Sequence, residues 1–170
     1  AGNCFAGVAQ TMEAARLGWH VALIGGFFIM PSILHHVLSF NNMNRRVLLA
    51  ILYLWALSYP IIWLFRLTKM DVAYVVGGFY MPIPANLFYK SYYLIWLLGV
   101  CYATWLVFRK CFFASSADAK RPLLLYAVAF IFGMWGGGTY VFFTMFNLNI
   151  FYPYGNFLIV FYSTLITYAI

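Results

Sequence analysis

The residues from Leu17 to Phe40, LGWHVALIGGFFIMPSILHHVLSF, decide the fold of this chain. They form an uninterrupted run of 24 residues without Lys, Arg, Asp or Glu, and the run stops at the polar stretch NNMNRR, residues 41–46. As an α-helix the run is about 36 Å long, enough for the ~30 Å hydrocarbon core of a bilayer. We therefore predict that this segment crosses a membrane once.

The rest of the chain repeats this pattern of apolar runs and polar connections. The predicted helices cover residues 17–40, 47–65, 91–108, 122–146 and 156–170. The sequence of 170 residues is 66% hydrophobic and 8% charged, whereas soluble domains carry about a quarter charged residues. The expected fold class is all-α: a polytopic bundle of about five transmembrane helices in a single domain, residues 1–170.

A long connection, residues 66–90, lies between the second and third predicted helices, and its second half is expected to be a non-helical loop. Its second half, residues 77–86, holds two glycines and two prolines, which are typical of turns and loops. Its aromatic residues favour the headgroup level of a bilayer. We expect this loop to fold back on the bilayer surface.

Basic residues at the helix ends indicate an orientation. Alternating crossings place the loops 41–46 and 109–121 on one side. That side holds Arg45, Arg46, Arg109, Lys110, Lys120 and Arg121, and the other side holds Arg16, Arg66, Lys69 and Lys90. Because basic residues in short loops favour the cytoplasm, we predict that both loops and the C-terminus are cytoplasmic. The net charge of +7 is explained by these helix ends, so nucleic acid is not an expected partner.

Three histidines, His20, His35 and His36, lie in the first predicted helix. An ionisable group inside a membrane is a candidate functional residue. On a helix His20 and His35 are about 22 Å apart along the axis, and His35 and His36 point about 100° apart. No later predicted helix contains a histidine. We therefore predict no haem or metal ligation and no cofactor, and expect these side chains at a helix interface or near the headgroups.

Catalytic chemistry is not indicated by the acidic residues or the cysteines. Glu13, Asp71 and Asp118 all fall in predicted connections, which argues against a proton or cation pump. The three cysteines include no CxxC pair, so neither a metal site nor a disulfide framework is expected. We predict that this chain by itself is not an enzyme.

Glycines in the centre of the fourth predicted helix are candidates for helix packing. Gly133 and Gly137 are four residues apart, with Gly136 beside them, a spacing that lets another helix approach closely. Consecutive glycines could equally mark a kink, so both interpretations stay open.

Aromatic residues make up 22% of the chain, and many tyrosines fall at predicted outer helix ends. One interpretation is an interfacial belt. The other is a shallow outer pocket for an apolar or aromatic signal, formed by the two outer loops. The candidate pocket residues are Phe79, Tyr80, Tyr89, Tyr152, Pro153 and Asn156.

Two motifs in the C-terminal part resemble a known membrane region. They are YPYGN at 152–156 and YAI at 168–170. They are similar to the end of the seven-helix N-terminal region of bacterial membrane histidine kinases, where a YP-x-G(N) turn joins the last two helices and the last helix runs into YAI. Looser similarities are Met12–Ala15, Pro31 with the nearby His35 and His36, and Gly78–Pro82.

The resemblance implies a sensor of a two-component system in the bacterial inner membrane. The five helices would correspond to the third through seventh of that region, and the last would pass a signal to a cytoplasmic output module. The phospho-accepting histidine and ATP-binding domain are expected beyond Ile170. The last run, Phe157–Ile170, reaches only about 21 Å as a helix, so we expect the natural chain to continue.

A second function is also compatible with the sequence. An aromatic, charge-poor bundle could be a non-catalytic structural or accessory subunit of a larger bioenergetic or photosynthetic membrane complex, where it would bind lipid or pigment. The expected partners are the lipid bilayer and either other membrane subunits or a second copy of the chain. A transporter is disfavoured because the apolar runs lack carboxylates and no internal repeat is visible.

Overall fold

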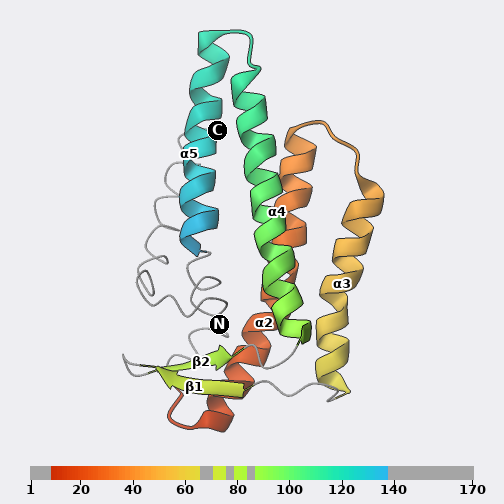
Figure 1. Cartoon of the computed structure of the whole chain (residues 1–170), viewed down its shortest axis with the longest axis vertical. Helices are drawn as coiled ribbons and strands as arrows, with labels where there is room; N and C mark the ends of the chain where they lie inside the picture. The colour runs from red at the N-terminus through yellow and green to blue at the C-terminus, as the bar shows by residue number, and fades with distance from the viewer. Residues whose placement is uncertain (1–8, 66–70, 76–78, 84–86, 138–170) are drawn as a thin grey trace. The chain divides into compact units, whose positions relative to one another are not determined.

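A computed structural model of the chain describes residues 9–65, 71–75, 79–83 and 87–137. Its elements are the helices α2 (Met12–Phe40) and α3 (Arg46–Leu64), the strands β1 (Asp71–Val75) and β2 (Phe79–Ile83), and the helices α4 (Leu87–Phe112) and α5 (Ala117–Gly137) (Figure 1). Three helices, α2, α3 and α4, are long and apolar enough to cross a membrane. The prediction of a helical membrane bundle is confirmed, and the described residues add one short hairpin to it.

The helices extend beyond the apolar runs from which they were predicted. α2 begins at Met12 and not at residue 17, and α4 covers residues 87–112 instead of 91–108. The added turns contain charged residues such as Lys90. Hydropathy marks only the part of a helix that lies in hydrocarbon, whereas backbone hydrogen bonding continues into the headgroup region.

The fourth predicted helix also begins earlier than expected. α5 starts at Ala117 and not at residue 122, so Pro122 is its sixth residue and lies in the second turn, where it cannot donate a hydrogen bond to the carbonyl of Asp118. Residues 138–146 and the predicted helix at 156–170 lie outside the described residues. The number of crossings therefore stays a prediction.

A specific backbone pattern ends α2 at the polar stretch after Phe40. The Met43 N–H donates to the carbonyl of Leu38 and the Asn42 N–H to that of Ser39, both at 2.9 Å. Asn42 has a φ of 54°, in the left-handed region that Asn tolerates better than most residues. These features form a Schellman motif, which satisfies carbonyls at the end of the helix.

The strands β1 and β2 form an antiparallel hairpin within the long connection. Asp71 pairs with Ile83 and Val75 with Phe79. Pro82 pairs with Val72, and a two-stranded sheet tolerates this proline because each strand has an outer edge. Residues 77–86 of this connection were predicted to be a non-helical loop, and neither strand was predicted; in β2, Pro82 interrupts the pattern.

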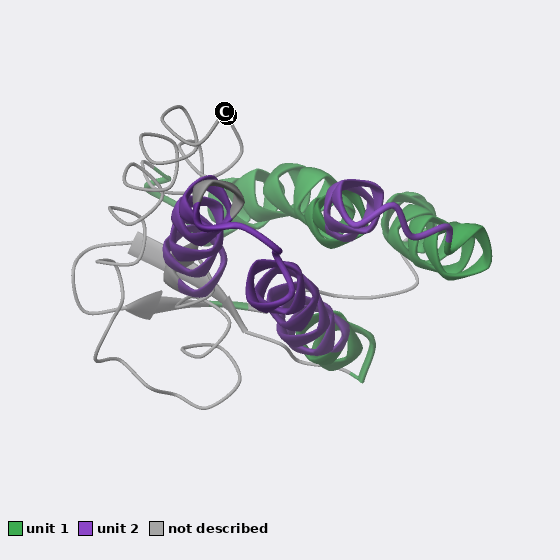
Figure 2. Cartoon of the chain, turned by 90° about the horizontal axis from the view of Figure 1, so that it is seen from above, with its two compact units in different colours: residues 1–33, 45–94 green, residues 34–44, 95–170 purple. Residues whose placement is uncertain are grey.

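The chain divides into two compact units, drawn in green and purple in Figure 2. Unit 1 comprises residues Ala1–Ile33 and Arg45–Leu94, and unit 2 comprises Leu34–Asn44 and Ile95–Ile170. The helices α2 and α4 contribute to both units. The described core of unit 2 is mostly aliphatic: Leu34, Val37, Leu38, Val100, Ala103, Leu106, Val107, Ala127 and Ala129 are buried.

Candidate functional site

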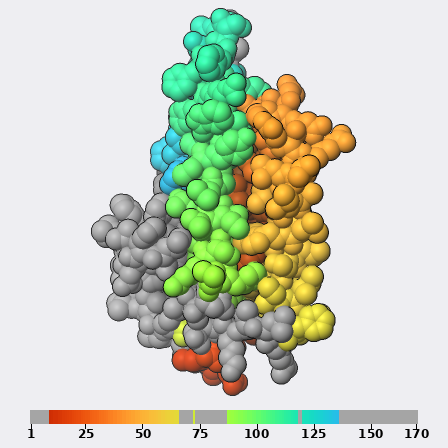
Figure 3. All heavy atoms as spheres, turned by 45° about the vertical axis from the view of Figure 1, so that its right-hand side comes forward, coloured from red at the N-terminus to blue at the C-terminus, as the bar shows by residue number. Residues whose placement is uncertain are grey.

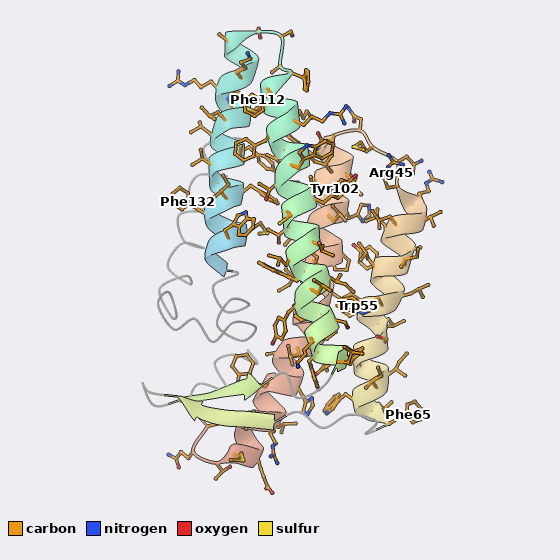
Figure 4. The ribbon with its side chains drawn as sticks, in the orientation of Figure 1. Arg45, Trp55, Phe65, Tyr102, Phe112 and Phe132 are labelled. Atoms are coloured by element: carbon orange, nitrogen blue, oxygen red, sulfur yellow. The ribbon has the colours of Figure 1, made fainter. Side chains whose placement is uncertain are left out.

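Unit 1 contains a cluster of aromatic side chains from three helices. Phe27 of α2 is fully buried, and four rings stack on it with centroid distances between 4.1 and 5.7 Å. These rings belong to Trp55 and Tyr59 of α3 and to Phe88 and Tyr92 of α4. We call these five residues the aromatic cluster. Figure 4 labels Trp55, which stacks on Tyr92 as well, at 5.6 Å.

Helical spacing brings these rings to the same place. Trp55 and Tyr59 are four residues apart on α3, as are Phe88 and Tyr92 on α4, so each pair shares one helix face. Offset aromatic pairs contribute about 0.5–1.5 kcal/mol each beyond the area that they bury. The cluster therefore stabilises the contacts among α2, α3 and the start of α4 in unit 1.

A polar pair adjoins the aromatic cluster. His20 Nδ1 lies 2.9 Å from the hydroxyl oxygen of Tyr59, and the Trp63 ring stacks on the His20 ring at a centroid distance of 5.3 Å. Tyr59 is fully buried, so its hydroxyl needs a hydrogen-bonding partner in this apolar surrounding. Which group donates depends on the tautomer of His20. The pair is a polar contact between two membrane-spanning helices.

A second hydrogen bond links α4 to the backbone of α2. The Tyr92 hydroxyl donates to the carbonyl of Gly26 at 2.8 Å. A Cβ atom added at Gly26 would lie 3.6 Å from that hydroxyl oxygen, which is an ordinary van der Waals distance. Tyr92 thus contributes both a stacked ring and an interhelical hydrogen bond to unit 1.

His35 and His36, the other two candidate residues, lie in unit 2. The side chains of His35 and His36 are exposed, and the His36 ring is 6.1 Å from the ring of Tyr126. In the part of the chain that the structure describes, no group of three or more His, Cys, Asp or Glu side chains could hold a metal ion. His20 is the histidine with a hydrogen bond to another helix that defines the polar pair of unit 1.

The predicted outer pocket is described only in part. Tyr89 is 3% exposed and contacts Tyr59 and Phe88 edge-on, with centroid distances of 6.0 and 5.8 Å. It therefore lies in the interior of unit 1, beside the aromatic cluster. Phe79 and Tyr80 lie on β2, of which only the backbone is described. Tyr152, Pro153 and Asn156 lie outside the described residues, so the pocket stays a prediction.

The predicted packing glycines lie on α5. Gly133 is buried in unit 2, and the helix continues through Gly136 and Gly137, which form its described end. Near Gly133, the Trp135 indole N–H donates to the hydroxyl oxygen of Thr104 on α4 at 3.3 Å. This contact shows α4 and α5 packed together at the level of Gly133.

Lys110 makes a contact that its position in the sequence does not predict. Its Nζ donates to the carbonyl oxygen of Phe40 and lies 3.8 Å from the centroid of the Phe40 ring. The Phe40 ring in turn stacks on Tyr126 at 4.7 Å. A cation at the C-terminus of a helix is favoured by the helix dipole, so Lys110 of α4 caps the end of α2 in unit 2.

Comparisons of the chain with models of protein families, with curated proteins and with solved structures gave no match. The similarity to the histidine-kinase membrane region therefore depends on the short motifs quoted above.

Proposed function

We propose that this chain is the membrane-embedded sensor domain of a receptor, with a cytoplasmic output module beyond Ile170. The observation that carries the proposal is the hydrogen-bonded pair of His20 and Tyr59 beside the aromatic cluster. Polar groups inside a membrane are costly and are usually retained for function. The YPYGN and YAI motifs support the same function through their resemblance to histidine-kinase membrane regions.

The contacts of unit 1 suggest how a stimulus would act. The aromatic cluster and the His20 pair involve α2, α3 and α4 together, so a ligand or a change in lipid packing that favours a different ring arrangement would shift all three helices. A stimulus changes an equilibrium only by its differential affinity for the two states. Small shifts of packed helices are a common means of transmitting such a change. The last helix would then pass the change to the output module.

The test measures the output activity of the natural full-length protein and of its variants in membrane vesicles. Tyr59→Phe and His20→Leu each remove the hydrogen bond, and we expect either change to alter the basal rate of phosphate incorporation from ATP severalfold. Leu54→Ala is the matched control, because Leu54 is exposed on α3 and makes no part of the cluster. Phosphorylation that is absent, or equal in all four proteins, would contradict the proposal.

A specific observation favours the alternative of a subunit in a larger membrane complex. α3 presents an exposed apolar face, visible in orange and yellow in Figure 3, with residues between 47% and 75% exposed: Val47, Ile51, Leu54, Leu57, Ile61 and Leu64. Lipid or a neighbouring subunit would cover this face. Purification from native membranes in mild detergent tests the alternative. A stoichiometric set of partners together with a stop codon after Ile170 would favour it over the sensor.

A further inference from the structure

All charged residues after position 94 gather at one turn in unit 2. Residues 95–170 contain five charged residues, all between positions 109 and 121: Arg109, Lys110, Asp118, Lys120 and Arg121. The basic residues lie within roughly one helical turn of the end of α4 or the start of α5, about 6 Å. Lys110 is engaged with Phe40. The side chains of Arg109, Lys120 and Arg121 are exposed.

Exposed aromatic side chains lie beside these cations. Phe112 and Phe113 are 74% and 82% exposed, and Trp105 is 54% exposed. Trp105, Arg109 and Phe112 are spaced at i, i+4 and i+7, so they form one stripe along α4. The Arg109 guanidinium carbon lies 5.5 Å from the Trp105 ring centroid. Figure 4 labels Phe112 near the turn between α4 and α5.

The length of α4 allows its charged end to reach headgroup depth. Its 26 residues span about 39 Å, roughly 9 Å more than the hydrocarbon core. Because charged side chains avoid hydrocarbon, we place the end of α4 with Arg109 and Lys110 outside it. Side chains on a helix tilt toward its N-terminus, so the aromatic side chains at this end of α4 lean back toward the bilayer. Tryptophan and arginine are both favoured at this level of a membrane.

We propose that this turn binds the headgroup of an anionic phospholipid. Arg109, Lys120 and Arg121 bind the phosphate, and Trp105, Phe112 and Phe113 contact the upper acyl carbons. Four basic residues against one acid make the surface complementary to a negative headgroup, and a polybasic segment beside a membrane helix attracts such lipids. The proposal is independent of the sensor function, because it depends on unit 2 alone.

The experiment is native mass spectrometry of the full chain, released from detergent with equimolar dioleoyl phosphatidylglycerol and dioleoyl phosphatidylcholine. We expect the wild-type protein to retain phosphatidylglycerol at least about tenfold more than phosphatidylcholine. The triple variant Arg109→Gln, Lys120→Gln, Arg121→Gln should retain both lipids about equally. The conservative triple variant Arg109→Lys, Lys120→Arg, Arg121→Lys should keep the preference.

The matched control is the triple variant Arg45→Gln, Arg46→Gln, Lys90→Gln, which removes the same charge from exposed positions of unit 1. It should keep the phosphatidylglycerol preference. If the control loses the phosphatidylglycerol preference equally, the lipid is attracted by the overall positive charge and the proposal is overturned. A wild-type protein without the preference would overturn it as well. Displacement of the lipid by equimolar inorganic phosphate would overturn it too, because the acyl contacts would then contribute nothing.

A measurement on the wild-type protein covers the case in which the glutamine variant fails to fold. Raising the ionic strength about tenfold shortens the Debye length about threefold. The phosphatidylglycerol preference should therefore fall while total lipid retention stays, since the aromatic contacts are unaffected by salt. A preference that is independent of salt would overturn the proposal.

Discussion

Tyr59 combines full burial with a hydroxyl 2.9 Å from His20 Nδ1, and its ring stacks on Phe27 at 4.3 Å. The ring and the hydroxyl thus serve different contacts. The substitution Tyr59→Phe distinguishes the two kinds of contact, because phenylalanine keeps the stacking and loses the hydrogen bond. The substitution therefore removes the polar contacts of the hydroxyl, with His20 and with Tyr89, and keeps the ring stacking.

We expect Tyr59→Phe to lower the free energy of unfolding by about 1 kcal/mol, the usual size of an interhelical hydrogen bond in a membrane protein. Denaturation in mild detergent measures it. Tyr102→Phe is the matched control on α4, since no hydrogen bond of the Tyr102 hydroxyl occurs within the described residues. A loss of equal size in the control would mean that the His20 contact contributes no stability.

Phe27 is the ring on which the aromatic cluster is built. Phe27→Ala should cost about 3–5 kcal/mol, because it removes four stacking contacts and leaves a cavity. Phe65→Ala, at a position that is 67% exposed, should cost much less in the same unfolding titration. If the two variants lose similar amounts of unfolding free energy, the aromatic cluster stabilises unit 1 no more than an exposed ring does.

At the scale of elements, the end of α2 depends on two devices, the left-handed Asn42 and the cation of Lys110. Asn42→Val should destabilise the chain by about 1–2 kcal/mol, because a β-branched residue is strained at positive φ. Asn42→Gly should be neutral or stabilising. Asn44→Val, at an exposed neighbouring position with ordinary φ, is the control in a thermal unfolding series. Equal effects of valine at 42 and 44 would count against the Schellman motif.

Lys110→Met should loosen the last turn of α2. A hydrogen bond to a charged donor is worth about 1.5–3 kcal/mol when it is buried, and Lys110 is half-buried, so a loss of about 1 kcal/mol is expected. Amide hydrogen exchange at residues 38–43 should accelerate. Lys90→Met, at an exposed site on the same helix, should leave that exchange unchanged. Unchanged exchange in Lys110→Met would mean that the backbone motif ends α2 without the cation.

At the scale of the whole molecule, the basic loops predict which side of the membrane each connection faces. In a chain without its native cysteines, Ser115→Cys should react with an impermeant maleimide only after the cells are permeabilised. Leu87→Cys, at the opposite end of α4 and highly exposed, should react in intact cells. If Ser115→Cys reacts in intact cells and Leu87→Cys only after permeabilisation, the predicted orientation is wrong.

The helical membrane bundle could be predicted from the sequence because the requirement behind it is local. Each apolar run must satisfy its own backbone hydrogen bonds in lipid, and only a helix of sufficient length does so. The end of α2 was likewise predicted at Phe40, because the apolar run stops there at a polar stretch. The left-handed Asn42 and the Schellman motif that end the helix were not predicted.

Only the tertiary structure decided which side chains form the aromatic cluster and which residue caps α2. The ring of Phe27 meets Trp55 and Tyr92, and Lys110 meets Phe40, across long stretches of sequence. In a chain where almost every residue is apolar, hydropathy no longer distinguishes a face that meets protein from a face that meets lipid. The partners of each aromatic ring therefore follow from how the helices pack against one another, which no single segment specifies.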